Sequence, residues 1–472
     1  MRFDPDFGTA ADAARAVATG AISARALTEH VLARIERLDP ALGLFITVAR
    51  EQALAEAEAA DNRRARGEPP RPLDGVPVVI KDVLATAGLR TTAGSASLAS
   101  YVPAEDAVAV ARLRAAGAIV VGKTSTPEMA ADWQSYNELS GTARNPWDRA
   151  RTPGGSSGGT AGALAAGLGF LGPGGDLSGS IRIPASFCGV YGHRPTIDLV
   201  PIRGHIPPPP GVAPGPSELS TIGPMARSAS DLRMALDVMA GPDALRPIPG
   251  VLPPPRGKSL GEYRLGYVLD DPFCPLDGPV RETLTGAVAA LRDAGARLSE
   301  GWPPGVDPAE QHDLYAWLLA AFLSQGMPDD AYEAMRRGSG GDPWTQGTIA
   351  THRQWLRQSS RRLEARARWQ EFFRTHDAFL MPSTFVAAFP HDHSPDLNGR
   401  RLGNRPYTDL ARWSFASVLT GCPATAAPAG RTTSGLPVGL QILGPFHEDA
   451  TSIDLAERFA EVLGGFVAPP GV

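Results

Sequence analysis

Residues 154–196 read GGSSGGTAGALAAGLGFLGPGGDLSGSIRIPASFCGVYGHRPT, and the interpretation of the whole chain starts from this stretch. It contains two glycine-flanked serine clusters, a small-residue helical pattern between them, an acid at Asp176 and a base at Arg182. A flexible glycine-serine linker shares part of this composition. The stretch is not a linker, because it also carries apolar side chains that need a core, namely Ile181, Ile183, Phe187, Val190 and Tyr191.

The glycines beside the serines have a chemical meaning. Glycine adopts backbone conformations that other residues avoid, and it lets the backbone approach a substrate closely. Successive backbone N–H groups in such a loop can converge on an anion. Because acyl transfer builds negative charge on an oxygen in its transition state, the segment suits a serine-dependent reaction at a carbonyl group.

Short apolar runs alternate with helical patterns on both sides of this segment. Apolar runs at residues 76–80 and 118–121 predict strands, and a helical pattern at 105–116 lies between them. Such alternation predicts an α/β fold with a largely buried sheet.

The chain is predicted to form one domain over residues 1–472, since nothing between 70 and 460 resembles a linker. It divides into a helical N-terminal layer at 1–67, a catalytic core at 73–228, and a variable, pocket-lining C-terminal part at 229–472. In the N-terminal layer, Ser23 is expected to cap a helix that the Asp39-Pro40 pair ends.

Composition excludes several classes of protein. The chain is 43% hydrophobic and 20% charged, as in ordinary globular proteins, and its net charge of −5 offers no basic excess for a nucleic-acid partner. No apolar stretch reaches the roughly 18 residues that a membrane span needs. Three distant cysteines, Cys188, Cys274 and Cys422, and the lack of a secretory signal pattern predict a cytoplasmic protein without a disulfide framework.

Three short motifs match known patterns in the wrong context. Residues 117–124, GAIVVGKT, fit the phosphate-binding pattern GxxxxGK[ST], but the residues between the glycines predict a strand, so no nucleotide site is expected. Residues 154–158 fit the GxSxG elbow of α/β-hydrolases, yet no hydrophobic strand leads into the serine. The triplet His391-Asp392-His393 is interpreted as a solvated loop, and no metal site is predicted.

The 154–196 segment resembles the amidase signature, whose core runs GGSSGG and continues with DxGGSIRxP and CGxxGxKPT. The similarity extends to LDGVPVVIKD at 73–82, GKTSTPE at 122–128, NPWD at 145–148, GPMARS at 223–228 and GLPVGLQ at 435–441. The resemblance implies a single α/β/α domain in which helices flank a large mixed β-sheet. It implies chemistry that needs no histidine and no cofactor.

The same resemblance implies a Ser-Ser-Lys triad. Ser180 is the expected nucleophile, Ser156 the hydroxyl that carries protons, and Lys81 the base. A lysine acts as a base near neutral pH only if its pKa falls from about 10.4 towards 7, and burial of the amine lowers it in that direction. The family holds the peptide bond before its first serine in the cis form, which falls on Gly155–Ser156 here.

The oxyanion hole that the resemblance implies consists of backbone N–H groups at Leu177, Ser178, Gly179 and Ser180. The chain departs twice from the family pattern in this loop. Ser178 stands where glycine is usual, and Gly175 stands where threonine is usual. If position 178 required a positive φ, its side chain would be costly.

Three further residues are expected to support the site without reacting. Asp176 and Arg182 are expected to pair and hold the loop, and Ser157 is expected to orient its neighbours through hydrogen bonds.

The sequence says less about the residues that contact the substrate than about the triad. The stretch 129–134 matches a pocket wall of the family, and its residues Met129, Ala131, Trp133 and Gln134 suggest an apolar acyl or aryl binding face, with ordinary core residues as the alternative. Further pocket residues are expected at 310–345 and 380–400. The proline-rich stretch 205–217 is interpreted as a surface connection, with a lid or wall of the site as the alternative.

The expected activity is hydrolysis of a small-molecule amide, with a carbamate or an ester as alternatives on the same site. A second alternative is the amidase-like subunit of a glutamine-dependent tRNA amidotransferase. That subunit type usually reads SIRQPA, whereas Ile183 stands in place of the glutamine here. A catalytically inactive binding relative is disfavoured because Lys81, Ser156 and Ser180 are all present. For the oligomeric state of the chain, a homodimer is an alternative to a monomer.

Overall fold

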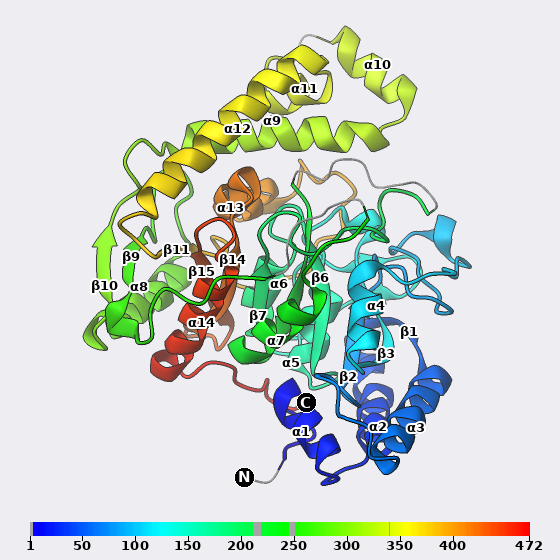
Figure 1. Ribbon diagram of the computed structural model, residues 1–472. Coiled ribbons are helices and arrows are strands. Elements are labelled where there is room, and N and C mark those ends of the chain that lie inside the picture. The colour runs from blue at the N-terminus through cyan, green and yellow to red at the C-terminus, as the bar shows by residue number, and fades with distance from the viewer. Residues whose placement is uncertain (1–2, 211–218, 245–250, 339) are drawn as a thin grey trace.

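An eleven-stranded mixed sheet runs through the centre of the computed structural model, which describes residues 3–210, 219–244, 251–338 and 340–472 (Figure 1). Its strand order is β1-β3-β2-β6-β8-β7-β14-β15-β11-β9-β10. The strands are β1 (Phe45–Val48), β2 (Pro77–Lys81), β3 (Ile119–Thr124), β6 (Leu171–Asp176), β7 (Tyr191–Arg194), β8 (Thr221–Ala226), β9 (Arg264–Tyr267), β10 (Arg297–Glu300), β11 (Ala378–Pro382), β14 (Ala424–Arg431) and β15 (Pro437–Leu443).

Helices flank this sheet, and two small hairpins lie outside it. The helices are α1 (Ala10–Ala18), α2 (Ala24–Leu42), α3 (Arg50–Ala65), α4 (Val108–Ala115), α5 (Gly158–Ala165), α6 (Arg182–Cys188), α7 (Ala229–Met239), α8 (Gly278–Asp293), α9 (Pro308–Leu323), α10 (Asp329–Arg337), α11 (Pro343–Thr348), α12 (His352–Phe372), α13 (Phe415–Thr420) and α14 (Asp449–Leu463). The hairpins pair β4 (Tyr136–Asn137) with β5 (Gly141–Thr142) and β12 (Arg401–Leu402) with β13 (Arg405–Pro406). The α/β fold predicted from the sequence is therefore confirmed.

The direction of the strands determines where loops can meet. β2 pairs in parallel with both β3 and β6, and β9 pairs in parallel with β10 and β11. Between β6 and β11, each pair of neighbouring strands is antiparallel. Since β2 and β6 are parallel neighbours, their carboxyl ends lie at the same edge of the sheet.

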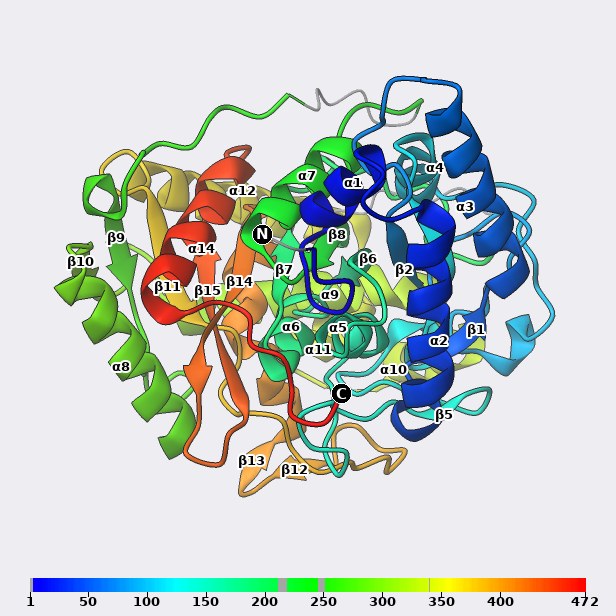
Figure 2. The ribbon, with the colours of Figure 1, turned by 90° about the horizontal axis from the view of Figure 1, so that it is seen from below.

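The N-terminal residues form α1, α2 and α3, but they also contain the short strand β1, where the sequence predicts only helices. Figure 2 shows α2 and α3 beside the β1 edge of the sheet, and α8 beside the opposite edge. Ser23 caps α2 by accepting a hydrogen bond from the N–H of Ala26 at 3.0 Å. The helix does not stop at Asp39-Pro40: it continues to Leu42 and ends at Gly43, whose φ of 62° is left-handed. Pro40 has no N–H to donate back to the preceding turn, and the helix ends shortly after it.

The predicted strands at 76–80 and 118–121 correspond to β2 and β3, with α4 between them. The residues between Gly117 and Lys123 thus form a strand and not a phosphate loop. The Lys123 amine is buried and donates to the carbonyl oxygen of Leu84 at 2.5 Å and to the hydroxyl of Thr91 at 2.7 Å. Lys123 is therefore a core residue with its own partners.

A group of helices formed by α9 to α12 projects at the top of Figure 1. The buried Trp369 of α12 donates its indole N–H to the Gln311 side chain of α9 at 3.0 Å, and this bond ties the two long helices together. α9 comes from the variable part of the chain, and it reaches the site through Tyr315, as described below.

The described ranges contain neither a membrane-spanning helix nor a metal-binding group of side chains. Within them, no helix has both the length and the apolar character that crossing a membrane requires. No three His, Cys, Asp or Glu side chains gather into a metal-binding group in this part of the chain. The rings of His391 and His393 lie 5.5 Å apart, and all three cysteines are free and buried.

Glycines allow α5 to pack directly on neighbouring backbone. A Cβ on Gly159 would lie 2.4 Å from the carbonyl oxygen of Ser125 and 2.8 Å from that of Leu44. Both contacts are to backbone atoms, which cannot rotate away. α5 starts directly after the first serine cluster, so this packing also positions that cluster.

We expect Gly159→Ala to lower the free energy of unfolding by about 2 kcal/mol, because overpacking a well-filled core displaces backbone. The matched control is Gly286→Ala on the exposed face of α8, where nothing lies within 4 Å of the new methyl group. That control should raise stability by about 0.5 kcal/mol, since alanine is the better helix former. Urea unfolding of both variants measures the difference, and equal stabilities would contradict the packing argument.

Candidate active site

The three predicted triad residues lie at the ends of neighbouring elements. Lys81 is the last residue of β2, Ser156 lies just before α5, and Ser180 lies between the end of β6 and the start of α6. Because β2 and β6 are parallel neighbours, Lys81 and the loop that carries Ser180 are at the same edge of the sheet.

The structure places Lys81 and Ser156 in direct contact. The Lys81 Nζ donates to the Ser156 Oγ at 2.6 Å, and each residue is only 1% exposed. Burial lowers the pKa of the Lys81 amine from 10.5 to about 7, while the negative charge of Asp176 opposes this shift. The amine can therefore lose its proton near neutral pH.

The backbone around Ser156 is closely packed. The Gly155–Ser156 peptide bond is cis, as the family resemblance implies. A Cβ on Gly155 would lie 2.6 Å from the carbonyl carbon of Trp133 and from the N of Gln134, so only glycine fits there. The Ser156 carbonyl oxygen also accepts a hydrogen bond from the Thr126 hydroxyl at 2.9 Å.

Ser180 is joined to the first serine cluster through the backbone. The N–H of Ser157 donates to the carbonyl oxygen of Ser180 at 3.1 Å, and Ser180 is 7% exposed. Within the described ranges the Ser180 hydroxyl makes no hydrogen bond. The structure thus forms the contact between Lys81 and Ser156, while the contact between the two serine hydroxyls is not formed in this state. Catalytic hydrogen bonds often tighten only once substrate is bound.

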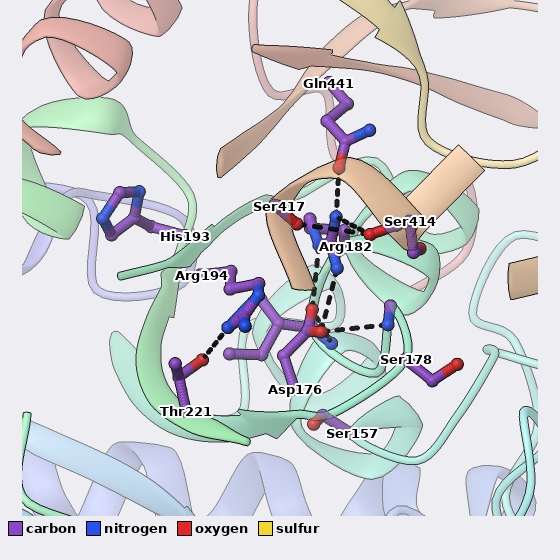
Figure 3. A network of polar contacts seen from close by, with 12 residues as sticks. Ser157, Asp176, Ser178, Arg182, His193, Arg194, Thr221, Ser414, Ser417 and Gln441 are labelled. Carbon is purple, nitrogen blue, oxygen red and sulfur yellow. Dashed lines mark hydrogen bonds and ion pairs between the residues drawn. The ribbon is translucent and has the colours of Figure 1, made fainter. Parts of the chain in front are cut away.

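The loop that carries Ser180 is held by Asp176 (Figure 3). Its carboxylate accepts bonds from the Arg182 Nε at 2.9 Å and Nη2 at 3.0 Å, and from the N–H groups of Gly179 at 2.9 Å and Ile181 at 3.2 Å. Burial alone would raise the pKa of Asp176, but the charge and hydrogen bonds of Arg182 outweigh it and lower that pKa to about 2. Asp176 and Arg182 therefore pair as predicted and are both fully buried.

The oxyanion loop differs from the expectation at Gly179. Its N–H is bonded to Asp176, so it does not point to an oxyanion in this conformation. In the part of the chain that the structure describes, the N–H groups of Leu177, Ser178 and Ser180 have no hydrogen-bond partner. These three groups are the donors that remain for an oxyanion.

The positive φ in this loop belongs to Gly179, at 88°, and not to Ser178. The serine that replaces the usual glycine therefore causes no backbone strain. The Ser178 hydroxyl instead forms a short hydrogen bond with the phenol of Tyr315 on α9, and its carbonyl oxygen accepts from the Trp133 indole at 2.9 Å.

Tyr315 is a site residue that the sequence motifs did not identify. Its position falls within the 310–345 region where pocket residues are expected, but no motif distinguishes it there. Burial raises its pKa to about 12, so the phenol stays protonated at neutral pH.

The predicted substrate-binding residues divide into two groups. Met129 and Trp133 are half-buried and Ala131 is exposed, so all three have surface that a ligand could reach. Gln134 is fully buried, and its amide donates to the Asp392 carbonyl oxygen at 2.6 Å and accepts from the Asp392 N–H at 3.1 Å. One N–H and one lone pair of the Gln134 amide thus tie the 129–134 stretch to Asp392, and a substrate contact at Gln134 stays a prediction.

Ser157 contacts Gly175 of β6, the strand that leads to the nucleophile loop. Its hydroxyl is 3.4 Å from both the N and the O of Gly175, and its N–H holds the Ser180 carbonyl. These contacts place Ser157 where a supporting residue is expected.

Comparison with known proteins identifies the family. The family model described as Amidase matches residues 26–452. The chain belongs to the amidase signature family. Family membership indicates an enzyme that acts on C–N bonds.

Relatives in this family cover almost the whole chain. The A-type subunit of the glutamyl-tRNA(Gln) amidotransferase from Anaeromyxobacter sp. (strain K) is 35% identical over 97% of both chains. The solved A-type subunit from Thermotoga maritima covers 94% of both chains with a TM-score of 0.77 at 26% identity. A solved chain from a vestigial protein complex, described as revealing the evolutionary origins of an s-triazine catabolic enzyme, covers 98% of this chain and 99% of its own, with a TM-score of 0.82 at 29% identity.

If Lys81 acts as a base, activity should depend on its neutral form. We expect kcat/KM for an amide to rise with pH through about 7 and to level off above, because the folded-state pKa lies at about 7. Lys81→Arg should lack the rising limb and the activity, since a guanidinium keeps its proton. Lys258→Ala, which removes an exposed lysine, should keep the parent profile. A rate that is constant from pH 6 to 8.5 would contradict a lysine base.

The buried ion pair gives a stability prediction. Asp176→Asn should lower the free energy of unfolding by about 3 kcal/mol, because it leaves the Arg182 guanidinium buried without its counter-charge. Asp12→Asn breaks the exposed Asp12–Arg15 pair and should change it by less than about 0.5 kcal/mol. Denaturant unfolding at pH 7 compares the two, and a small effect of Asp176→Asn would show that the loop does not depend on this charge.

Proposed function

We propose that this chain cleaves the C–N bond of an amide through an acyl-enzyme on Ser180. The observation that carries the proposal is the buried Lys81 amine, 2.6 Å from the Ser156 hydroxyl and with its pKa lowered to about 7. A neutral amine bonded to one serine beside the loop of a second serine is an arrangement that can activate a hydroxyl nucleophile.

The first half-reaction forms one bond and breaks another. The Ser180 oxygen attacks the carbonyl carbon and gives its proton to Ser156, which passes its own proton to Lys81. As the C–N bond breaks, Ser156 protonates the departing nitrogen and recovers a proton from Lys81, so the amine leaves neutral. The acyl group stays on Ser180 as an ester.

The second half-reaction uses water in place of the amine. Water gives a proton through the same relay and adds to the acyl carbon, and the Ser180 oxygen leaves with that proton as a hydroxyl. The carboxylic acid is released and the triad returns to its starting state. In both halves the negative oxygen would be held by the free N–H groups of Leu177, Ser178 and Ser180, and each such donor is worth about 3 kcal/mol.

The substrate we propose has an apolar acyl or aryl group. The half-buried Trp133, whose indole bonds the Ser178 carbonyl oxygen in the nucleophile loop, supports this proposal, and Met129 and Ala131 of the same stretch also have accessible apolar surface. A carbamate or an ester could use the same site, because the tetrahedral chemistry is shared. The buried, free cysteines support a reducing compartment, and we propose the cytoplasm.

The second candidate function is that of an amidotransferase A-type subunit, in which the released amine is passed to a partner. The relatives favour it, since the A-type subunit of the Anaeromyxobacter amidotransferase matches at 35% identity over nearly full length. The chain's own sequence is less favourable at Ile183, a buried aliphatic residue where that subunit type usually has glutamine. Both candidates share the acyl-enzyme on Ser180.

One substrate panel tests the proposal and separates the two candidates. The purified chain, without partner or ATP, is given a matched anilide, carbamate and ester, and separately glutamine, with intact-mass detection of the acyl-enzyme. We expect turnover of the anilide and an acyl adduct, and both should disappear in Ser180→Ala. The control Ser360→Ala changes an exposed serine of α12 and should behave as the parent.

The alternative outcomes are distinct. Turnover of glutamine alone, without the anilide, would favour the amidotransferase role. Turnover of the ester or carbamate alone would replace the amide as the substrate. An acyl adduct that persists in Ser180→Ala would overturn the assignment of the nucleophile.

A further inference from the structure

His205 lies near Lys81, across the space that a side chain at position 175 would fill, although no motif points to it. Its Nε2 is 2.9 Å from the position that a Cβ on residue 175 would take, and the Lys81 Nζ is 3.9 Å from the same position. A threonine at position 175, which is usual in the family, would collide with this imidazole. The His205 imidazole therefore takes the space that a side chain at position 175 would fill.

The backbone holds His205 in this place. Leu84 and His205 form an isolated antiparallel bridge, and the N–H of Ile206 donates to the carbonyl oxygen of Val83 at 2.8 Å. These contacts join the start of the proline-rich stretch to the segment that directly follows Lys81. Of that stretch, residues 205–210 are described, and residues 211–217 lie outside the described residues. The described part supports the interpretation of the stretch as a wall of the site.

The hydrogen bond that the His205 ring makes determines which of its two nitrogens can accept another hydrogen bond. The His205 Nδ1 lies 3.1 Å from the carbonyl oxygen of Pro207. A carbonyl oxygen only accepts hydrogen bonds, so Nδ1 carries the proton and Nε2 has a free lone pair. Burial and the nearby Lys81 charge lower the pKa of His205 to about 4, which keeps the ring neutral at pH 7.

The nearness of Nε2 to Lys81 puts this acceptor on the side where the proposed reaction protonates its leaving group. In that reaction Ser156 protonates the departing nitrogen, so the nitrogen must come within hydrogen-bond distance of Ser156 and hence close to Lys81. His205 is half-buried, which leaves part of the side chain open to a ligand. A secondary amide has one N–H that needs an acceptor there, whereas an ester oxygen has none.

We propose that His205 is a specificity-determining residue that accepts a hydrogen bond from the N–H of the departing amine through Nε2. This inference rests on the proposed function and deepens it, because it identifies amides that carry an N–H as the preferred substrate class. The contact favours amides over matched esters and also orients the nitrogen towards Ser156.

The test is the ratio of kcat/KM for a secondary anilide to that for the ester with the same acyl group. His205→Leu fills a similar space without an acceptor and should lower this ratio about tenfold, as expected for a lost hydrogen bond. His205→Gln retains an acceptor and should recover part of the ratio. Gly175→Ala should also lower it, because the new methyl group displaces the imidazole without removing it.

The control is Arg203→Ala, which changes an exposed residue of the same segment and should leave the ratio unchanged. A ratio within twofold of the parent in His205→Leu would overturn the inference while leaving the proposed function intact. An equal loss on both substrates would assign His205 a purely structural role and would also overturn it. A parent protein that turns over no amide would overturn the proposed function first, and this inference with it.

Discussion

The ionised carboxylate of Asp176 is the group on which the arrangement of the site depends. It has no exposed surface, and its charge is balanced by the paired Arg182 and by two backbone N–H groups. These bonds shape the turn between β6 and α6, in which three other N–H groups have no partner among the described residues. The same charge favours the protonated form of the Lys81 amine, but burial outweighs this effect and lowers the pKa of Lys81.

Much of the site could be predicted because its chemistry is local in sequence. The segment 154–196 alone carries the nucleophile loop, the ion pair and the first serine cluster, and the apolar run before Lys81 places that lysine at a strand end. Parallel pairing of β2 with β6 then brings these segments together. Periodicity predicted β2, β3 and the helix between them, but it predicted neither β1 nor β6, whose sequence LGPGGD has no strand pattern.

The rest depends on contacts between distant segments. Tyr315 reaches Ser178 from a helix 137 residues away, and Gln134 is held by Asp392 at a separation of 258 residues. Neither contact leaves a pattern in the local sequence. The departures at positions 175 and 178 were visible as differences from the family, but their meaning required the side chains of His205 and Tyr315. His205 occupies the space left by Gly175, and Tyr315 bonds the hydroxyl that Ser178 adds, and both residues lie outside the signature segment.

The strand order also has a consequence for synthesis of the chain. Lys81 lies on β2 and Ser180 follows β6, and β6 is covered on its other side by β8, which ends at Ala226. Contacts of such large sequence separation form late, because the loop between them must close first. A nascent chain on the ribosome therefore carries both serines for some time before the lysine can be enclosed beside them. Reactivity should arise only once β15 has also emerged and joined the sheet, because Arg182 of the nucleophile loop bonds the Gln441 side chain on that strand.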